Sequence, residues 1–372
     1  MPWSLRDRTC VVGVGNTRYG VFPTTDDYGL ASEALGMAVA DAGLTHDDID
    51  GLIINRLGSY EKFAEANRIN PQYCLRTEAE GRLSGMSLML AVQAVHCGLA
   101  NTVALVYGNN GKSVGIKYGG ADDMNIWAPW GFTSPGATHA MMFRRHMAQY
   151  GTTSKDLAEI AVAVRHHASL NSNAVKRKPI TIAEHQSSRM ICDPLRLLDY
   201  CLINDGGVAL IVTSAERSKD LKKKPVFVSG FACQDTFSHA SMPTTDYWYP
   251  ALRTVARKVY GRSGIERDAV KGLMIYDNFT ATVLFSLEGM GFCEQGQGGA
   301  FVRDGTLQLG RGRWPTNTSG GHLSESYMQG WGLLAESIRQ CRGECDVRQI
   351  PDCDVTQYIC ATNMAMSLMF HS

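Results

Sequence analysis

The N-terminal third of the chain alternates between short apolar runs and longer stretches with helical periodicity. Runs rich in valine, isoleucine and leucine predict strands at residues 9–14, 49–55 and 102–107. Apolar residues at intervals of three and four predict helices at residues 28–42 and 84–97. Strands that alternate with helices in this way are typical of an α/β layer fold, and here they predict a parallel sheet.

The segment from Gly111 to Arg145 interrupts this alternation, because it is rich in Gly, Trp, Pro and Met and has little periodicity. Such a composition predicts a long functional loop, within a wider loop region over about residues 111–200. One helix is expected inside that region, at residues 154–171, with Ser154 as its N-cap. The apolar stretch Trp127–Phe132 fits either the wall of a pocket for a large hydrophobic group or an oligomer interface.

The second half of the chain repeats the α/β plan more loosely. The predicted strands are 226–231, 272–276 and 355–361, and the predicted helices are 249–260, 279–290 and 332–341. A charged stretch over residues 219–224, followed by Pro225, marks a boundary between two similar units. The sequence therefore predicts an N-terminal half over residues 1–224 and a C-terminal half over residues 225–372.

Composition limits the classes of function. The 372 residues contain 36 Lys and Arg and 36 Asp and Glu, so the net charge is zero. A neutral chain gives no reason to expect a nucleic-acid partner, and it does little to oppose self-association, so an oligomer is expected. No apolar run approaches the roughly 20 residues of a membrane helix, and the N-terminus lacks the plan of a signal peptide. The expected location is the cytoplasm, away from membranes.

The chain has eleven cysteines, and their arrangement argues against a metal site or a disulfide scaffold. There is no Cys-x-x-Cys pair of the kind that binds zinc, and the count is odd. A chain of this length also needs no disulfides to stabilise its core. We therefore expect free, mostly buried thiols in a reducing compartment and no bound metal.

Six short motifs occur in the order and spacing found in one large enzyme family. The motifs are Gly13-Val14-Gly15-Asn16-Thr17, the helix–strand unit from Glu78 to Gly108, Asp205-Gly206-Gly207-Val208-Ala209-Leu210, Tyr276-Asp277-Asn278-Phe279, Leu287-Glu288-Gly289-Met290-Gly291-Phe292-Cys293 and Asn317-Thr318-Ser319-Gly320-Gly321. Together they resemble the thiolase superfamily, especially its sterol-carrier-protein and lipid-transfer branch, over almost the whole chain. The resemblance implies two mixed-sheet halves in αβαβα layers, a homodimer and an acyl-CoA substrate.

The chain departs from working thiolases at each catalytic position. In those enzymes a cysteine at the start of a buried helix attacks the thioester, and here Gly81 or Arg82 stands at that position. Tyr276 replaces the His or Asn of a second segment, and Tyr327 replaces the His of a Gly-His-Pro turn. The late cysteine that moves protons corresponds to Cys360, which Ala361-Thr362 follows in place of glycines.

This pattern of replacements resembles the thiolase-like steroid side-chain aldolases. In that subgroup two tyrosines replace the thiolase acid and base groups. The implied reaction is retro-aldol cleavage of a β-hydroxyacyl-CoA to a ketone or aldehyde and a shorter acyl-CoA. The resemblance also implies an OB-fold partner of the DUF35 type, in a heterotetramer. Coenzyme A is part of the substrate, and no further cofactor is expected.

Retro-aldol cleavage needs a base for the β-hydroxyl proton and donors for the enolate, but it needs no covalent nucleophile. A phenol has a pKa of about 10, and apolar burial raises it further, so a tyrosine base requires a nearby cation, donors or a relay. One of Tyr276 and Tyr327 is expected to act as the base and the other as the proton donor or relay. The sequence leaves open which tyrosine has which role.

Residues beside the tyrosines are candidates for support. His322 is a possible partner that tunes Tyr327, and the backbone N–H groups of Gly320 and Gly321 are candidates for contact with the enolate. Asp277 is expected either to orient Tyr276 or to cap the helix that follows, and Asn278 belongs to the same supporting group.

Other interpretations remain open at this stage. The tyrosines fit core or interface aromatic positions. Arg82 fits either a solvated or packed side chain, or a group that fills the former acyl pocket or holds a carboxylate. Two other functions compete with the aldolase. One is an acyl transfer that uses Cys360 or another cysteine, and the other is a catalytically silent scaffold subunit of a thiolase complex.

Overall fold

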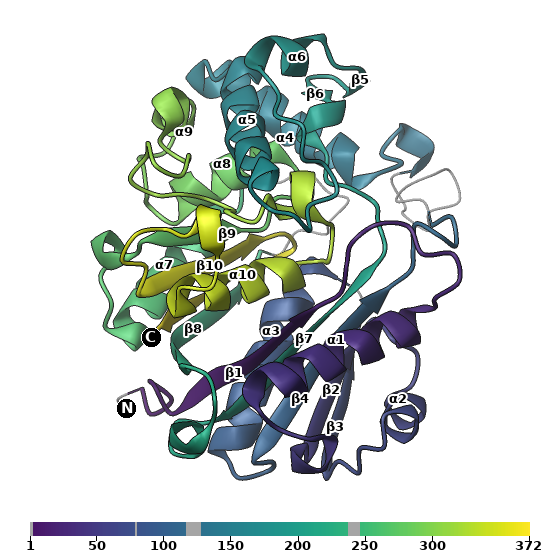
Figure 1. Ribbon diagram of the computed structural model, residues 1–372. Helices are drawn as coiled ribbons and strands as arrows, with labels where there is room; N and C mark the ends of the chain where they lie inside the picture. Colours follow the sequence, from purple (N-terminus) through teal and green to yellow (C-terminus); the bar gives the residue numbers. More distant parts are fainter. Residues whose placement is uncertain (1–2, 79, 117–127, 237–245) are drawn as a thin grey trace.

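The computed structural model describes residues 3–78, 80–116, 128–236 and 246–372. Among these residues, nine strands form one long mixed sheet in the order β3-β2-β4-β7-β1-β8-β11-β10-β9 (Figure 1). The strands are β1 (Thr9–Asn16), β2 (Gly51–Asn55), β3 (Tyr73–Thr77), β4 (Thr102–Asn109), β7 (Gly206–Ser214), β8 (Val226–Asp235), β9 (Gly272–Ile275), β10 (Val355–Ala361) and β11 (Met364–His371).

The sheet has two halves that meet where β1 and β8 pair at Cys10–Phe227 and Val11–Val226. In the first half β2 runs parallel to β3 and β4, whereas β7 runs antiparallel to both β4 and β1. In the second half β8, β11 and β10 are antiparallel, and β10 is parallel to β9. Two mixed halves are therefore confirmed. The expectation of a parallel sheet is wrong, because the β10–β11 hairpin and the long excursion between β4 and β7 return the chain in the opposite sense.

Helices lie on both outer faces and between the two halves. Helix α1 (Asp27–Ala42) covers the first half, and α7 (Tyr249–Ser263) and α8 (Thr280–Gly289) cover the second. Helices α3 (Gly81–His96) and α10 (Trp331–Arg342) contact strands of both halves, so they form the middle layer (Figure 1). The αβαβα order of layers is confirmed.

Each layer boundary has its own apolar core, and strand β2 shows how the pleat divides its side chains between two of them. Ile53 faces the middle layer, and it belongs to the same apolar core as Leu88 of α3 and Trp331 of α10. Its neighbours Leu52 and Ile54 face the opposite way, into the core under α1. Alternate strand residues point to opposite faces, so a sheet buried on both sides reads as a continuous apolar run.

Glycines in three strands allow α1 to lie directly on the sheet. A Cβ atom at Gly15 of β1 would lie 2.0 Å from the carbonyl oxygen of Ala34 in α1. A Cβ atom at Gly108 of β4 would lie 2.0 Å from the carbonyl oxygen of Asp27. The same contact at Gly207 of β7, with the carbonyl oxygen of Leu30, would be 2.2 Å. The glycine motifs of the sequence are thus a consequence of close packing between helix and sheet.

The predicted loop region over residues 111–200 is corrected by the structure, since it contains α4 (Pro135–Tyr150), α5 (Ser154–Ser169) and the short α6 (Ile182–Ser187). They form a helical cap at the top of Figure 1, with the hairpin β5 (Met190–Cys192) and β6 (Leu195–Arg196). Helix α4 escaped detection because its buried face includes His139 and His146, which do not count as apolar in a periodicity pattern. The N-cap of α5 is Thr153, which forms a capping box with Asp156, and not Ser154.

Four further elements were not expected from the pattern: β3, β11, α2 (Tyr60–Ala66) and α9 (Gly298–Phe301). The expected aromatic stretch begins at Trp127, which lies outside the described residues; Ala128–Trp130 form a single 3₁₀ turn in which Trp130 is exposed. In the part of the chain that the structure describes, no helix is both long enough and apolar enough to cross a membrane.

Substitution of Gly15 by alanine is expected to destabilise the fold, because its methyl group would overlap the backbone of α1. Overpacking of this kind costs about 1–3 kcal/mol. The matched control is Gly36→Ala on the exposed side of α1, where a Cβ atom would meet nothing within 4 Å. That change removes a helical glycine and should stabilise by about 0.5–1 kcal/mol. Thermal unfolding of both variants tests the prediction, and equal midpoints would contradict it.

Candidate active site

Two tyrosines that lie 51 residues apart in the sequence meet at the end of the second half-sheet, and their hydroxyl oxygens are 2.9 Å apart. Tyr276 directly follows β9, and its N–H donates to the carbonyl oxygen of Ile359 in β10 at 2.8 Å. The N–H of Tyr327 donates to Oδ1 of Asn204 at 2.8 Å. Tyr276 is 1% exposed, whereas Tyr327 is partly exposed, so Tyr327 is the more accessible member of the pair.

The phenol of Tyr276 fills the space that a side chain at Gly81 would need. Gly81 is the first residue of α3, and a Cβ atom there would lie 2.2 Å from the Tyr276 hydroxyl oxygen. The side chain of the next residue, Arg82, instead reaches Oδ1 of Asn363 and the carboxylate of Glu80. Of the two candidates for the lost nucleophile position, Gly81 is therefore the one that faces the tyrosine pair.

The N-termini of α3 and α10 meet beside this pair. Gly330 is the N-cap of α10, and a Cβ atom at Gly330 would lie 2.4 Å from both Ser84 Oγ and the Tyr358 hydroxyl. Ser84 belongs to the first turn of α3, and its hydroxyl donates to the carbonyl oxygen of Gly81 at 3.0 Å. The first N–H groups of a helix lack helical partners and carry partial positive charge, so this region favours an anion.

A glycine-rich turn directly before Tyr327 is hydrogen-bonded to β9. Asn317 fixes the turn to the strand, because its Oδ1 accepts from the N–H of Ile275 at 2.7 Å and its Nδ2 donates to the carbonyl oxygen of Ile275 at 2.8 Å. Gly320 and Gly321 then adopt φ values of 104° and 52°, which favour glycine. Their N–H groups donate inside the turn, to the Asn317 carbonyl and the Ser319 hydroxyl. The glycine pair thus shapes the turn, and its expected contact with an enolate stays a prediction.

The carboxylate of Asp277 lies under this turn. It accepts from the N–H groups of His322 at 2.8 Å and Leu323 at 3.3 Å, within a single π-helical turn over Gly321–Glu325. A Cβ atom at Gly321 would lie 2.3 Å from Asp277 Oδ2, so only glycine fits there. Burial raises the pKa of Asp277 to about 7.

The expectation that Asp277 caps the following helix is wrong, because α8 has Phe279 as its N-cap and Asp277 caps the turn instead. Asn278 supports the start of that helix. Its Oδ1 accepts from the hydroxyl of Thr282 at 2.7 Å and from the N–H of Phe279 at 3.1 Å.

His322 lies against both tyrosines. The ring centroids are 4.6 Å apart for Tyr276 and 5.2 Å apart for Tyr327, and both contacts are edge-to-face. Nε2 of His322 accepts from the N–H of Gly330 at 2.9 Å. Burial lowers the pKa of His322 to about 3, so the imidazole is neutral at physiological pH. Its ring contacts Tyr327, and its expected influence on the chemistry of Tyr327 stays a prediction.

The electrostatic surroundings of the two candidate reactive groups differ from those of free side chains. Burial raises the pKa of Tyr276 well above its usual value, and the neighbouring Tyr327 adds to the effect. Burial likewise raises the pKa of the Cys360 thiol to about 12. A thiol that stays protonated is a poor nucleophile, so the buried surroundings of Cys360 give no support to acyl transfer by its thiol.

Several supporting residues escaped the sequence interpretation. The side chain of Asn204 accepts the backbone N–H of Tyr327, and that of Asn317 accepts the N–H of Ile275, the residue before Tyr276. Only the tertiary fold creates these contacts. Glu325 is buried two residues before Tyr327, and its carboxyl accepts from Ser319 Oγ at 2.6 Å and Asn171 Nδ2 at 3.0 Å. Burial raises the pKa of Glu325 to about 8. A glutamate inside a glycine-rich turn was a usable signal for this buried acid.

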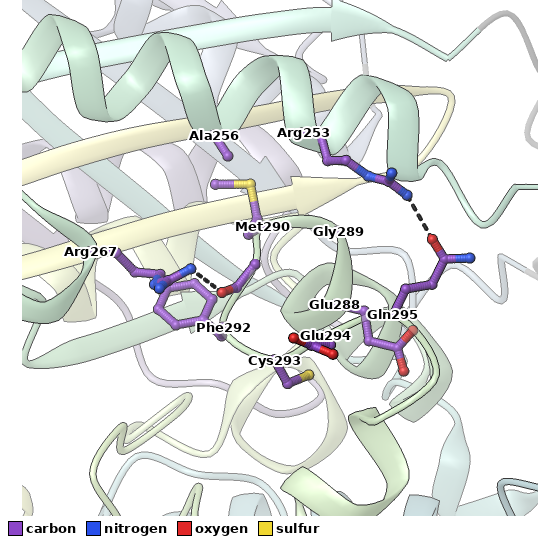
Figure 2. A pocket seen from close by; sticks show the side chains of 11 residues that line it. Arg253, Ala256, Arg267, Glu288, Gly289, Met290, Phe292, Cys293, Glu294 and Gln295 are labelled. Carbon is purple, nitrogen blue, oxygen red and sulfur yellow. Dashed lines mark hydrogen bonds between the residues drawn. The ribbon is translucent and has the colours of Figure 1, made fainter. Parts of the chain in front are cut away.

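An open pocket of about 600 Å³ lies elsewhere, around the C-terminal end of α8 (Figure 2). Arg253 reaches across it to Gln295 at 2.8 Å, and Arg267 bonds to the backbone of Gly291 (Figure 2). Helix α8 separates this pocket from the tyrosines near its own N-terminus, so the pocket is not part of their site. Within the described ranges, no group of three or more His, Cys, Asp or Glu side chains is placed to hold a metal ion.

Comparison with known proteins explains this arrangement. Residues 233–370 match the family described as thiolase C-terminal domain-like. Over 360 residues the chain is 36% identical to the 17-hydroxy-3-oxo-4-pregnene-20-carboxyl-CoA lyase of Mycobacterium tuberculosis, which covers 91% of this chain and 92% of the relative. The chain belongs to the thiolase superfamily. Within this superfamily, a steroid side-chain-cleaving aldolase of Thermomonospora curvata is 35% identical over 355 residues, or 90% of each chain.

Solved structures of the superfamily agree with the fold. The protein described as "Ltp2-ChsH2(DUF35) aldolase" superposes with a TM-score of 0.91 at 34% identity, over 99% of this chain and 98% of that one. The human mitochondrial 3-ketoacyl-CoA thiolase in complex with CoA has a TM-score of 0.71 at 11% identity, over 99% and 98% of the two chains. The second comparison supports the fold alone.

The buried carboxyl of Glu325 predicts a loss of stability at alkaline pH. A raised pKa means that the folded state holds a proton that the unfolded chain has released, so this stability is complete below the unfolded value of 4.5 and is lost as pH rises through about 8. Above about pH 7.5 His139, His167 and His322, whose pKa values burial lowers, no longer oppose this trend, because about nine tenths of the histidines in the unfolded chain are then neutral.

The thermal midpoint is therefore expected to fall between pH 7.5 and 8.5, and the fall should be smaller in Glu325→Gln, which keeps the shape and cannot ionise. Glu65→Gln, at an exposed position of α2, is the control and should behave like the unmodified protein. An identical fall in Glu325→Gln would show that Glu325 does not titrate in this range.

Proposed function

We propose that this chain is the catalytic subunit of an acyl-CoA aldolase that cleaves a β-hydroxyacyl-CoA into a ketone or aldehyde and a shorter acyl-CoA. The observation that carries the proposal is the hydrogen-bonded pair of Tyr276 and Tyr327, in the space that Gly81 leaves free. The enzyme is a carbon–carbon lyase of the thiolase superfamily, as its relatives at 36% and 35% identity are.

The substrate proposed for the site is a steroid side-chain thioester. The name of the mycobacterial relative describes a thioester whose α-carbon is attached to a carbon that bears a hydroxyl group. That is the β-hydroxy arrangement that retro-aldol cleavage requires. The second relative is named for cleavage of a steroid side chain, which supports the same substrate class.

In the first step, the phenolate oxygen of Tyr327 takes the proton of the β-hydroxyl. The β-carbon becomes a carbonyl carbon as the Cα–Cβ bond breaks, and the electron pair of that bond passes into the thioester enolate. In the second step a proton from the tyrosine pair adds to Cα and gives the shorter acyl-CoA. One proton leaves the substrate and one returns, so no redox cofactor, metal or covalent intermediate is needed.

The structure supports Tyr327 as the residue that meets the substrate, since it is the partly exposed member of the pair. Tyr276 lies behind it, within hydrogen-bond distance of the same hydroxyl. A hydrogen bond from one phenol stabilises the phenolate of the other. Burial raises the pKa of Tyr276, and the converging N-termini of α3 and α10 act in the opposite direction by favouring negative charge.

We also propose an OB-fold partner of the DUF35 type, bound to a homodimer of this chain in a heterotetramer. The support comes from the solved structure that superposes with a TM-score of 0.91, because its name includes a DUF35 component. A cytoplasmic location is proposed as well, because all eleven cysteines are free in the structure.

The tyrosine roles predict that Tyr276→Phe and Tyr327→Phe each lower kcat by about 100-fold or more, the usual contribution of a positioned acid or base. KM should change little, because the ring and its packing remain. The assay follows cleavage of a β-hydroxyacyl-CoA by the chain together with its partner. Tyr260→Phe is the control. Tyr260 lies on α7, away from the pair, and its hydroxyl donates to Oε1 of Gln357 at 3.2 Å. Normal kcat in both site variants would exclude the tyrosine mechanism.

The space at Gly81 gives a second test. Gly81→Ala adds a methyl group where the phenol of Tyr276 lies, so the pair should separate and kcat should fall by about tenfold or more. Gly261→Ala on α7, where a Cβ atom meets nothing within 4 Å, is the control. Thermal unfolding is measured beside kcat to separate loss of activity from loss of fold. An active and stable Gly81→Ala enzyme would show that the position of Tyr276 is not critical.

A further inference from the structure

His322 is buried beside the tyrosine pair, and nothing in the proposed reaction uses it. Its side chain is 1% exposed and its pKa is lowered to about 3 by burial, so it neither reaches solvent nor carries charge at neutral pH. A group of this kind is unsuited to acid–base catalysis, because its protonated form is absent over the working range of pH. Its contacts indicate a different role.

The hydrogen bonds of His322 define which ring nitrogen carries the proton. The N–H of Gly330 donates to Nε2 at 2.9 Å, so Nε2 holds a lone pair and the ring proton is on Nδ1. Nδ1 lies 3.3 Å from Asp277 Oδ1, in electrostatic contact but without hydrogen-bond geometry. The carboxylate of Asp277 also accepts the backbone N–H of His322 at 2.8 Å. Both ends of the residue are therefore held.

The same ring contacts both tyrosines. It meets Tyr276 at an interplanar angle of 71° and Tyr327 at 80°, with the edge-to-face geometry that aromatic pairs prefer. The rings of Tyr276 and Tyr327 are 6.4 Å apart at their centroids and touch through their hydroxyls. Since Gly330 is also the N-cap of α10, His322 connects the tyrosine pair to the start of that helix.

We propose that His322 is a positioning residue for the tyrosine pair, with its neutral ring packed against both phenols and held by Gly330 and Asp277. This inference rests on the proposed aldolase function. The imidazole ring holds the two hydroxyls at hydrogen-bond distance while the protons move, and it takes no proton itself. Asp277 acts through His322 and through the turn that it caps. Asp277 and His322 are therefore both positioning residues for the tyrosine pair.

Three variants test the inference in the aldolase assay, with the chain in complex with its partner. His322→Ala removes the ring that packs against both phenols. It is expected to lower kcat by about 100-fold, because small displacements of reacting groups have effects of this size. His322→Phe restores the ring but not its anchors, so it should recover about tenfold of that loss. KM should stay within about threefold in both variants, and the shape of the pH profile of kcat/KM should match that of the unmodified enzyme.

His167→Phe is the matched control. His167 is also buried, and its Nε2 also accepts a backbone N–H, from Leu309 at 2.9 Å, but no ring contact joins it to either tyrosine in the described structure. This control should lower the thermal midpoint as His322→Phe does, and it should leave kcat unchanged. Loss of kcat in proportion to loss of fold in all three variants would overturn the proposal, since His322 would then be only structural.

Two other results also overturn it. Normal kcat in His322→Ala would show that the imidazole ring is not needed to position the tyrosines. The loss of one limb of the pH profile in His322→Phe would show that the imidazole transfers a proton. Tyr327→Phe in the same assay separates this inference from the proposed function. If Tyr327→Phe is inactive while His322→Ala is normal, only the inference fails; if Tyr327→Phe is active, the tyrosine mechanism itself fails.

Discussion

The absence of a side chain at Gly81 is the constraint on which the site depends. The N-terminus of α3 lies beside the tyrosine pair, and the phenol of Tyr276 occupies the space that the first Cβ atom of that helix would need. A thiolase nucleophile at this position would exclude the tyrosine, and the tyrosine excludes a nucleophile. The two chemistries are therefore alternatives within one fold, which agrees with the general rule that function belongs to the site and not to the fold.

Burial of this site imposes a second requirement, which is that its polar groups be satisfied without free charges. His322 is kept neutral, and the carboxyls of Asp277 and Glu325 have pKa values raised to about 7 and about 8. Backbone N–H groups and short side chains satisfy the carboxyls, as Ser319 and Asn171 do for Glu325. A low-dielectric interior strengthens each of these bonds and makes any unpaired group costly, so the network fixes the turn that carries Tyr327.

Much of this could be predicted from the sequence, and the failures have physical causes. The strands and long helices of both halves follow from apolar runs and periodicity, because a sheet buried on both faces and an amphipathic helix leave clear patterns. Helix α4 was missed because it buries His139 and His146 among its apolar residues, which the pattern treats as polar. Strand β11 was missed because its methionines and serine do not resemble a β-branched strand.

The candidate site was predicted in part for a similar reason. Tyr276 and Tyr327 were found because motifs placed them at known catalytic positions, and their hydroxyls do meet in the structure. The capping alternative for Asp277 is wrong, because a carboxylate three residues before a helix has the same local sequence whether it caps that helix or reaches a turn 45 residues further along the chain. The ring contacts of His322 and the backbone contact of Asn204 depend on tertiary packing, which no local pattern records.

The remaining chemical question is how a phenol becomes basic enough inside a protein core. Burial disfavours the phenolate, and the structure contains two features that favour it: a second phenol 2.9 Å away and two helix N-termini that meet at the pair. Neither feature places a full positive charge beside the tyrosines, so the pair can share one proton without becoming a permanent ion pair. Such a pair suits a reaction that takes one proton from the substrate and returns one, because the site ends each cycle in the state in which it began.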